Sequence, residues 1–346
     1  MYLRRVMNPY SPHMRNTLLA CLLSSLCLFS NLSLQAQNPE TKPQSSPPVL
    51  PGNGLSHFDF FYAGEAKTQT MYIVRDGKIT WSYTHNALKG EISDAVMLSN
   101  GNILFAHQFG ITEITPDKKV VWNYDAPEGT ETHTAQPIGN DKVLFLQNGD
   151  PAKLIVMNIR TNTVLKELTL PTGNPSKIHG HFRHARLTKA GTILVAHLDM
   201  GKLCEYDSNG KQLMNIDVPG IWSAEELANG NILITSSKVV REMNRKLETV
   251  WEFPLSEATG YLLNSPQTSV RLKNGNTLVN NWFNQWNGNG QVEMDNQPVQ
   301  MVEVTPSKQI VWALRQWAEP NLGPATIFIP LSEPRTTEKV HFGDIH

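Results

Sequence analysis

The chain is short of cysteine and of net charge, and each shortage excludes a class of protein. Its 346 residues include three cysteines and carry 30 basic against 31 acidic residues, a formal net charge of −1. Nucleic-acid-binding proteins usually show a basic excess or stripe, so we expect no nucleic-acid partner. Cys21 and Cys27 lie in an N-terminal segment that we predict is removed, which leaves Cys204 alone. A single cysteine excludes both an internal disulfide and a cysteine-based zinc site.

No apolar run is long enough to be a clear membrane span. Three arginines precede an apolar run at 18–34, but serines and an asparagine interrupt it, and a spanning helix needs about 20 apolar residues. Ala36, flanked by two glutamines, is a small residue where a signal peptidase would cut. This layout predicts a cleaved secretory signal over 1–36, export to the periplasm or the extracellular space, and a mature chain that does not span the membrane.

Long helical periodicity is also missing from the rest of the chain. Prolines are frequent in 37–54, which predicts an extended linker. No long segment with a 3.6-residue apolar period follows it, which excludes a parallel α/β fold. We therefore predict one all-β domain over 55–346, since single all-β domains often reach about 250 residues.

What the chain does have is a repeated strand–turn–strand pattern. Residues 96–104 contain Leu-Ser-Asn-Gly-Asn-Ile-Leu, close copies occur at 226–233 and 270–278, and weaker copies occur at 186–194 and 137–144. A turn of the Asn-Gly type tolerates the positive φ angles that a tight hairpin requires. Each copy therefore predicts a β-hairpin.

A second hairpin follows each of these at a similar distance and usually ends in tryptophan. The segment 113–122 matches 303–312 closely, 241–251 and 73–81 are related to them, and 205–214 keeps the hairpin without the tryptophan. Together the two hairpins make four short strands in about forty residues, which is the period of a β-propeller blade. The tryptophans that end these hairpins are predicted to pack between blades; they are Trp81, Trp122, Trp251 and Trp312.

Counting these units predicts a six-bladed propeller. The first unit, 57–86, has only three strands, so the lone strand at 325–329 is expected to complete it and to close the ring. A seven-bladed ring, in which 321–346 contributes to a separate blade, is the alternative. The complete units are predicted at 91–127, 128–171, 178–219, 220–256 and 262–317.

Over residues 57–330 these hairpins resemble the PQQ-like repeats of the quinoprotein-alcohol-dehydrogenase-like and arylsulfotransferase-like propeller superfamily. Within it the chain is most similar to secreted bacterial members. The resemblance implies the fold but not bound PQQ, because the quinoprotein dehydrogenases have eight blades and vicinal cysteines over the quinone. No arylsulfotransferase motif of catalytic histidine and arginine can be mapped here. The outer-membrane-assembly propeller, which is also similar, is a non-catalytic scaffold.

Propeller geometry brings two kinds of segment to one face of the ring. The connection into each blade and the loop between its second and third strands lie on the same face, because successive strands alternate in direction. Most histidines of the mature chain fall in these segments. We predict a ligand-binding site on this face, with the candidate residues Asp94, His107, His133, Asn148, His179, His181, Arg183, His184, His197, Trp222, Gln267, Asn281 and Trp282.

The densest cluster of these candidates is the segment 179–184. In an extended strand, His179, His181 and Arg183 would share one side and His184 would point to the other. One interpretation is a pocket floor, where an imidazole acts as base or ligand and Arg183 binds a carboxylate or sulfate. The alternative is that these groups close the narrow axis through hydrogen bonds. The candidate catalytic residues are His181, Arg183 and His133.

A divalent metal is one option for a cofactor. His107, His133, His181 and His197 could converge from different blades, and neutral imidazole suits several transition metals. No local ligand spacing demands a metal, so no metal ligand is assigned. The cofactor is left open.

A polar insertion at 284–296 is the last candidate feature. Trp282 and Trp286 lie in or beside it and are accompanied by three asparagines, Asn281, Asn284 and Asn287. Aromatic rings with neighbouring amides can stack on sugars and bind their hydroxyls, or can simply pack on the protein surface.

Three functions are compatible with these residues. The first is an exported propeller that binds a glycan or an anionic small molecule on this face without turnover. The second is a lyase or sulfotransferase-like enzyme that acts on an anionic polymer or ester, with a central histidine as base and Arg183 stabilising developing charge. The third is a cell-envelope scaffold that binds another protein. A monomer is expected, and the sequence does not choose the ligand.

Overall fold

The computed structural model describes residues 49–65, 69–85, 90–283, 297–332 and 338–346. All described residues belong to the second of the two units into which the chain divides, Pro43–His346. The predicted signal sequence at 1–36 and most of the predicted linker lie outside the described residues. Within the described residues, no helix has the length and apolar character needed to cross a membrane.

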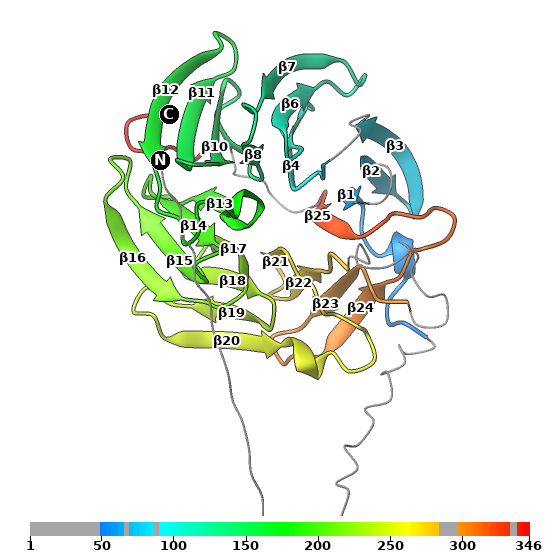
Figure 1. Ribbon diagram of the computed structural model, residues 1–346. Coiled ribbons are helices and arrows are strands. Elements are labelled where there is room, and N and C mark those ends of the chain that lie inside the picture. The colour runs from blue at the N-terminus through cyan, green and yellow to red at the C-terminus, as the bar shows by residue number, and fades with distance from the viewer. Residues whose placement is uncertain (1–48, 66–68, 86–89, 284–296, 333–337) are drawn as a thin grey trace, which may run out of the picture. The chain divides into compact units, whose positions relative to one another are not determined.

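The second unit is a six-bladed β-propeller, as predicted, and the seven-bladed alternative is wrong. Six antiparallel sheets form a ring, each with one strand next to the axis and one at the rim (Figure 1). We number the blades from the one that begins at β1; blade 1 also contains β25. The innermost strands of blades 1 to 6 are β25 (Ala325–Pro330), β4 (Asp94–Met97), the pair β8 (Glu131–Thr132) and β9 (Gln136–Ile138), β13 (Phe182–Leu187), β17 (Ile221–Glu226) and β21 (Ser269–Arg271).

The other strands follow outward from the axis in chain order. The second strands are β1 (Phe60–Glu65), β5 (Ile103–Ala106), β10 (Lys142–Asn148), β14 (Ile193–His197), β18 (Ile232–Ser236) and β22 (Thr277–Asn280). The third strands are β2 (Gln69–Arg75), β6 (Gly110–Ile114), β11 (Lys153–Asn158), β15 (Lys202–Tyr206), β19 (Val239–Met243) and β23 (Met301–Val304). The outermost strands are β3 (Lys78–His85), β7 (Val120–Asp125), β12 (Thr163–Thr169), β16 (Gln212–Asp217), β20 (Thr249–Pro254) and β24 (Ile310–Leu314). Three short 3₁₀ turns complete the described elements: η1 (Gly54–Ser56), η2 (Ile178–Gly180) and η3 (Leu255–Glu257).

The ring closes by pairing the two ends of the propeller sequence. β25 pairs antiparallel with β1, with Tyr62 opposite Phe328, which confirms that the C-terminal strand completes the first blade. The buried Tyr62 hydroxyl also donates to the carbonyl of Gly323, at 2.6 Å. The last strand is therefore held by a ladder and by a side chain, and it gives blade 1 its innermost strand.

The burial of each strand follows from its distance to the axis. β5 and β14 are buried at every position, whereas every residue of β12 is exposed or partly buried. Neighbouring sheets pack face to face, and Leu144, Val156 and Val195 belong to one core cluster that joins blades 3 and 4. Middle strands such as β5 and β14 therefore need continuous apolar runs, whereas an outermost strand such as β12 can carry polar residues.

In four blades, a buried glutamate occupies the equivalent position of the third strand. The hairpin between the first and second strands of the same blade donates a hydrogen bond to it. Between 0 and 8% of each of these residues is exposed. The residue after the hairpin glycine donates to the carboxylate in every case. The pairs are Asn102 with Glu113 (2.6 Å), Thr192 with Glu205 (2.5 Å), Asn231 with Glu242 (2.7 Å) and Asn276 with Glu303 (2.6 Å).

The next blade then supplies a basic group to the same carboxylate. The pairs are Arg160 with Glu113 (2.8 Å), Arg245 with Glu205 (2.7 Å), Arg271 with Glu242 (3.0 Å) and His57 with Glu303 (2.8 Å). A buried carboxylate needs hydrogen bonds and an opposite charge to be tolerated. Each of these glutamates therefore links two adjacent blades.

The tryptophans that end the second hairpins also link adjacent blades, as predicted. The indole Nε1 of each donates a hydrogen bond to a residue beyond its own blade. The pairs are Trp81 with Pro116 O (2.8 Å), Trp122 with Asn162 Oδ1 (3.3 Å), Trp251 with Pro306 O (2.9 Å) and Trp312 with Gly54 O (3.0 Å).

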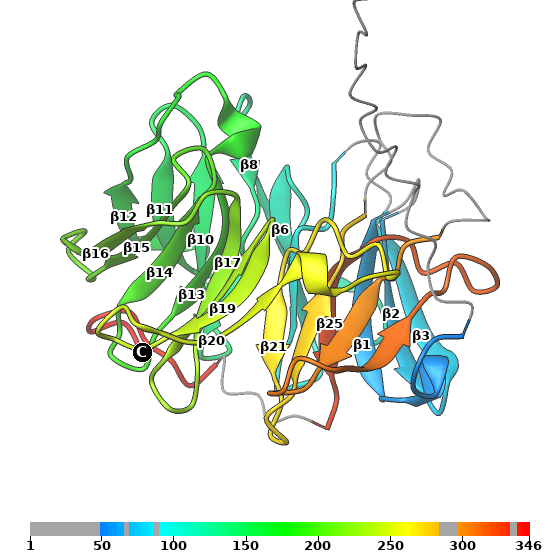
Figure 2. The ribbon, with the colours of Figure 1, turned by 90° about the horizontal axis from the view of Figure 1, so that it is seen from below.

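The C-terminal segment lies against the face that carries the hairpin turns between first and second strands, which we call the hairpin face. Phe342 is buried in the core cluster of blades 3 and 4, and the Gly343 amide donates to Gly191 in a hairpin turn. Figure 2 shows this segment at the end of the ring opposite β8. We call that opposite side, where the chain crosses into each blade, the crossover face.

Replacing Trp312 by alanine is expected to lower the free energy of unfolding by about 3–5 kcal/mol, the usual cost of removing a buried tryptophan. Trp312 is 0% exposed and stacks on His57 at 5.1 Å, so the cavity left behind would be enclosed. The equivalent Trp81→Ala change should cost less, because Trp81 is partly exposed. Urea unfolding of the two variants tests this, and equal losses would contradict it.

Candidate functional site

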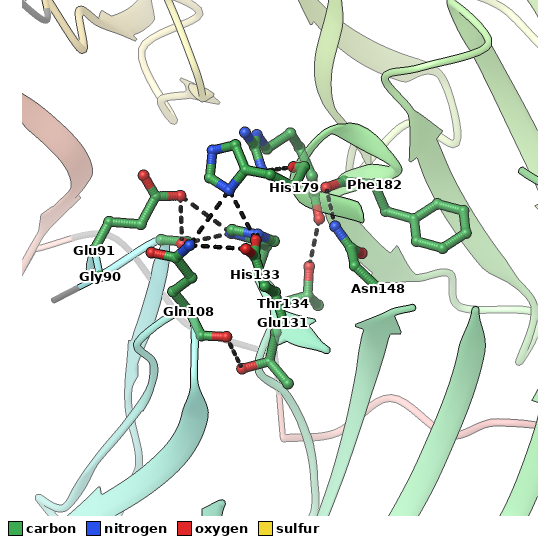
Figure 3. Close-up of polar contacts among 12 residues, drawn as sticks. Gly90, Glu91, Gln108, Glu131, His133, Thr134, Asn148, His179 and Phe182 are labelled. Carbon is green, nitrogen blue, oxygen red and sulfur yellow. Dashed lines mark hydrogen bonds and ion pairs between the residues drawn. The ribbon is translucent and has the colours of Figure 1, made fainter. Parts of the chain in front are cut away.

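The crossover face gathers two glutamates and two histidines from three blades. Glu91 precedes β4 in blade 2, Glu131 lies in β8 of blade 3, and His179 lies in η2, before β13 of blade 4. His133 lies between them, in a break of the innermost strand of blade 3 (Figure 3). We call these four residues the crossover cluster.

The break in the strand is what brings His133 to this position. β8 pairs with the far end of β10, at Gln147 and Asn148, and β9 pairs with its near end. In between, Thr134 leaves the sheet and binds blade 4, where its Oγ1 donates to the Arg183 carbonyl at 2.8 Å and accepts from the Ala185 amide. Residues 133–135 thus exchange ladder hydrogen bonds for contacts with the two neighbouring blades.

His133 lies between the two carboxylates and is fully buried. Its Nδ1 is 3.1 Å from Glu91 Oε1 and its Nε2 is 3.0 Å from Glu131 Oε2. Ser93 Oγ is 2.9 Å from the same Nδ1 and donates to Glu91. A neutral imidazole has one N–H and can donate to only one carboxylate. The two contacts therefore suit either an imidazolium, which donates to both carboxylates, or a bound cation that takes the place of one of the two ring protons.

His179 shares Glu131 with His133 but is open to solvent. Its Nδ1 is 2.8 Å from Glu131 Oε2, and its side chain is 52% exposed. Gln108 Nε2 donates to the other carboxylate oxygen of Glu131 at 3.0 Å, which orients that group. Figure 3 shows the second ring nitrogen of His179 directed away from the glutamates.

Both carboxylates of the cluster are held in the ionised form. Burial by itself raises the pKa of Glu91, but the hydrogen bond and charge of His133, together with Arg183 and His179, bring that pKa down to about 2. Burial likewise raises the pKa of Glu131, yet hydrogen bonds from His133, His179 and Gln108 hold it well below its usual range. Both glutamates of the cluster are therefore negatively charged at neutral pH.

Three residues of the cluster have the arrangement of metal ligands. The ligand atoms of Glu131, His133 and His179 all lie within 4.8 Å of one another, and no other group of three such residues does so in the described part of the chain. Adjacent ligands of an octahedral ion with bonds of about 2.1 Å are about 3.0 Å apart. The two Glu131–histidine distances, 3.0 and 2.8 Å, are close to that edge length.

Next to the crossover cluster, the same face carries an arginine and two tryptophans. Arg183 Nη1 donates to the His179 carbonyl at 2.7 Å, and its guanidinium lies 5.2 Å from the centre of the Trp222 ring. The rings of Trp222 and Trp282 are in turn 6.1 Å apart. Arg183 is 7% exposed, so it supports the residues of the site, and little of its guanidinium is accessible to a ligand.

Asp94 ties three blades together at the axis. Arg186 of blade 4 donates to both of its oxygens, at 2.8 and 2.7 Å, and the Ala135 amide of blade 3 donates at 2.9 Å. Burial alone raises the pKa of Asp94, but the charge of Arg186 brings it below its usual value. His184 is buried beside this pair, and burial lowers its pKa to about 3. Asp94 and His184, both predicted ligand residues, belong to the framework.

Several other predicted site residues are also buried and used by the framework. His181 Nε2 bonds the Asn174 carbonyl at 2.9 Å, and His197 Nε2 is bonded by the Tyr206 hydroxyl at 2.9 Å. His107 Nε2 lies 3.0 Å from Thr112 Oγ1. The four histidines considered as a metal set therefore meet different partners, and of these four only His133 belongs to the group arranged like metal ligands in the described part of the chain.

The predicted amides likewise brace loops. Asn148 Nδ2 donates to the Ile178 carbonyl of η2 at 2.9 Å, which supports the turn that carries His179. Asn281 is 0% exposed and donates to the carbonyls of Leu262 and Val299. Gln267 is 6% exposed and starts the segment that leads into β21. The rest of the predicted aromatic loop, with Trp286, Asn284 and Asn287, lies outside the described residues.

The expected alternation along 179–184 is wrong for its first half. Ile178–Gly180 form a 3₁₀ turn and the strand begins only at Phe182. His179 is therefore half exposed while His181, two residues later, is fully buried. The candidate base moves from His181 to His179.

Glu91 and Glu131 were not predicted. Glu131 and His133 stand two residues apart in the connection into blade 3, and Glu91 stands three residues before Asp94 in the connection into blade 2. Carboxylates in the same connecting segments as the histidines were the available signal.

Comparisons with known proteins agree on the fold. No protein-family model and no curated protein matches the sequence. A protein of unknown function from Bacteroides caccae is 24% identical, with a TM-score of 0.68, over 79% of this chain and 98% of that one. Catalytically inactive virginiamycin B lyase from Staphylococcus aureus, solved with quinupristin, is 12% identical with a TM-score of 0.51, over 76% and 97%. The WD40 domain of Neurospora crassa Pan2 is 12% identical with a TM-score of 0.50, over 75% and 78%. At these identities the likenesses show a β-propeller and nothing finer.

Acid is expected to destabilise the protein through its buried neutral histidines. Burial lowers the pKa of His197 to about 4, whereas an unfolded histidine has a pKa near 6.5, so the unfolded chain binds a proton that the folded chain refuses. The free energy of unfolding should be highest above about pH 6.5 and should fall by about 1.4 kcal/mol per pH unit for this group down to about pH 4.

A His197→Gln variant removes this contribution while keeping a hydrogen-bond acceptor for Tyr206. Urea unfolding at pH 7.5, 6.0 and 4.5 should show a shallower loss of stability with acid in the variant than in the wild type. Parallel curves for the two proteins would show that His197 is protonated in the fold.

Proposed function

We propose that this protein is an exported propeller that binds a divalent cation at Glu131, His133 and His179 and, through it, an anionic or oxygen-rich ligand on the crossover face. The observation that carries the proposal is the convergence of two ionised carboxylates and two imidazoles from three blades. Two like charges close together are costly unless a positive charge compensates them. A bound cation supplies that charge and leaves coordination positions for a ligand.

The donor set favours a divalent transition metal. Imidazole nitrogen suits zinc, iron, copper and nickel, while carboxylate oxygen suits manganese and magnesium, so a mixed set is best matched by ions between these groups. The remaining positions would face the solvent side, where His179 is exposed. Gln108 and Ser93, which already bind the two glutamates, would orient them in the loaded site.

The organic ligand that fits this face is an oligosaccharide with acidic groups. Trp222 and Trp282 lie beyond Arg183 on the same side as His179 and are partly exposed. Partly exposed indoles suit stacking against sugar rings, and a cation at the cluster suits a uronate or sulfate oxygen. Export, which rests on the N-terminal signal pattern, would place the protein where such polymers occur. Kinship with PQQ-like repeat propellers rests on the hairpin motifs alone.

A second candidate function is a lyase acting on the same ligand class. The observation that favours it is His179, whose Nδ1 is held by Glu131 while its other nitrogen faces solvent. A carboxylate that orients an imidazole in this way supports proton abstraction by the free nitrogen. A structural neighbour, virginiamycin B lyase, is an enzyme on a related fold.

Removing the shared carboxylate is expected to abolish cation binding. Glu131→Gln keeps the size of the side chain but loses the charge, and calorimetric titration with Mn²⁺ and Zn²⁺ should show at least a hundredfold weaker binding than for the wild type. Glu128→Gln is the matched control, because Glu128 is exposed, lies three residues away and removes the same charge. The control should bind as the wild type does.

Equal affinity in Glu131→Gln would overturn the cation site. Uronate and sulfated oligosaccharides added to the cation-loaded protein test the ligand class. Product formation would support the lyase, and its loss in a His179→Gln protein that still binds the cation would support His179 as the base. If the loaded protein neither binds nor converts any of them, a protein partner in the cell envelope becomes the better account of the crossover face.

A further inference from the structure

A cavity lies on the axis at the hairpin face, and it is separate from the crossover cluster. Its volume is about 650 Å³. It is bounded by the innermost strands β4, β13, β17, β21 and β25, which surround the centre of the ring (Figure 1), and by the hairpins that follow β13, β17 and β21. None of its lining residues belongs to the crossover cluster. We call it the hairpin-face cavity.

The Asp94–Arg186 ion pair separates the two sites. Arg186 lines the hairpin-face cavity, while Asp94, its partner, binds the Ala135 amide next to the break that carries His133. The pair is bidentate and its carboxylate is 0% exposed. A ligand in one half of the axis would therefore not contact the other half.

The wall of the cavity is largely apolar. Val96, Leu272, Ile327 and Ile329 line it, and Pro330 ends the strand that closes the ring. The volume falls within the range of about 300–1,000 Å³ that is usual for small-molecule sites, which combine apolar walls with a few polar groups. The body of a ligand here must therefore be apolar.

The basic groups that line the cavity already have partners. Arg186 is paired with Asp94, and Arg271 lies 3.0 Å from Glu242 of the neighbouring blade. The Lys189 ammonium donates to a backbone carbonyl at the hairpin, and Lys273 is exposed to solvent. The acidic Glu226 is paired with Arg245.

Glu225 is the exception among these charged groups. Its side chain makes no hydrogen bond or ion pair with any described residue, although it lines the cavity. The nearest charges that act on it are Arg186 of β13 and Arg271 of β21, and both are committed to other carboxylates. A partly buried carboxyl group without a partner is under-compensated, and a ligand cation would supply the missing interaction.

We propose that the hairpin-face cavity is a second binding site, which takes a small organic amine whose ammonium group pairs with Glu225 and whose apolar body packs against β25. The apolar wall selects the body of the ligand, and the unpartnered carboxyl selects its charge. An organic acid is disfavoured, because Glu225 would repel its carboxylate and because Arg186 and Arg271 are already paired with other carboxylates.

The pH dependence of binding follows from the same group. Burial raises the pKa of Glu225 to about 7, even though Arg186 and Arg271 act to lower it. The carboxyl is thus ionised in a minority of molecules at pH 6 and in most at pH 8. Because an ammonium group pairs with the ionised form, amine binding should strengthen as pH rises over this interval.

The test compares three ligands of one shape: 2-phenylethylamine, 2-phenylethanol and 3-phenylpropanoate. Calorimetric titration of the purified protein at pH 8 should show that the amine binds at least about tenfold more tightly than the other two. Glu225→Gln should remove this preference. Glu257→Gln, an exposed change of the same charge in η3, should keep it.

Three results would overturn the proposal: a preference for the carboxylate, equal affinity for amine and alcohol, or an unchanged amine affinity in Glu225→Gln. Folding of that variant is checked by its unfolding midpoint, which should not fall, because glutamine removes a poorly solvated charge. The Glu131→Gln variant should bind the amine normally, so failure of the cation site and failure of the amine site are distinguished.

Discussion

The buried glutamate of the third strand is the interaction on which the ring depends. In four blades it is bonded by the turn of its own first hairpin and by a basic group from the next blade. Because an unmatched buried carboxylate is strongly destabilising, this residue fixes both the hairpin and the spacing between sheets. Its last copy, Glu303, is bonded by His57 at the start of blade 1, so the same contact that joins neighbours also joins the two ends of the chain.

Ring closure brings the innermost strands together around one axis. The two proposed sites depend on which polar side chains of these strands and of the segments leading into them find partners there. Asp94 and Arg186 neutralise each other in the middle and divide the axis. On the crossover side, the broken strand of blade 3 brings His133 between Glu91 and Glu131. On the hairpin side, Glu225 lines an apolar cavity and has no partner among the residues that the structure describes. The charges of Asp94 and Arg186 cancel in the middle of the axis, whereas glutamates remain available to a ligand on both faces. For this reason a cation is proposed at each of the two sites.

The fold and part of the site were predictable from the sequence. The hairpins, the number of blades and the closing strand were predicted correctly, and so was the role of Trp312 and its equivalents between blades. His133, His179, Arg183 and Trp222 were assigned to one face, and contacts among them exist there. Glu91, Glu131 and Glu225 were missed, since nothing local distinguishes a glutamate that meets a histidine from one that meets water. His107, His197 and Asn281 were included because they stand at strand ends, where a buried polar residue and an exposed one look alike.

The sequence by itself determined the blade, because a strand, a turn of the Asn-Gly type and an apolar alternation are encoded within about ten residues and repeat along the chain. Only the tertiary structure decided which side chains meet. Glu91, His133 and His179 belong to three successive blades, and their contacts depend on the tilt of each sheet, on the break between β8 and β9 and on the turn at η2. Such contacts join residues about forty or more positions apart in the sequence. They form together when the ring closes, so no single local segment encodes any of them.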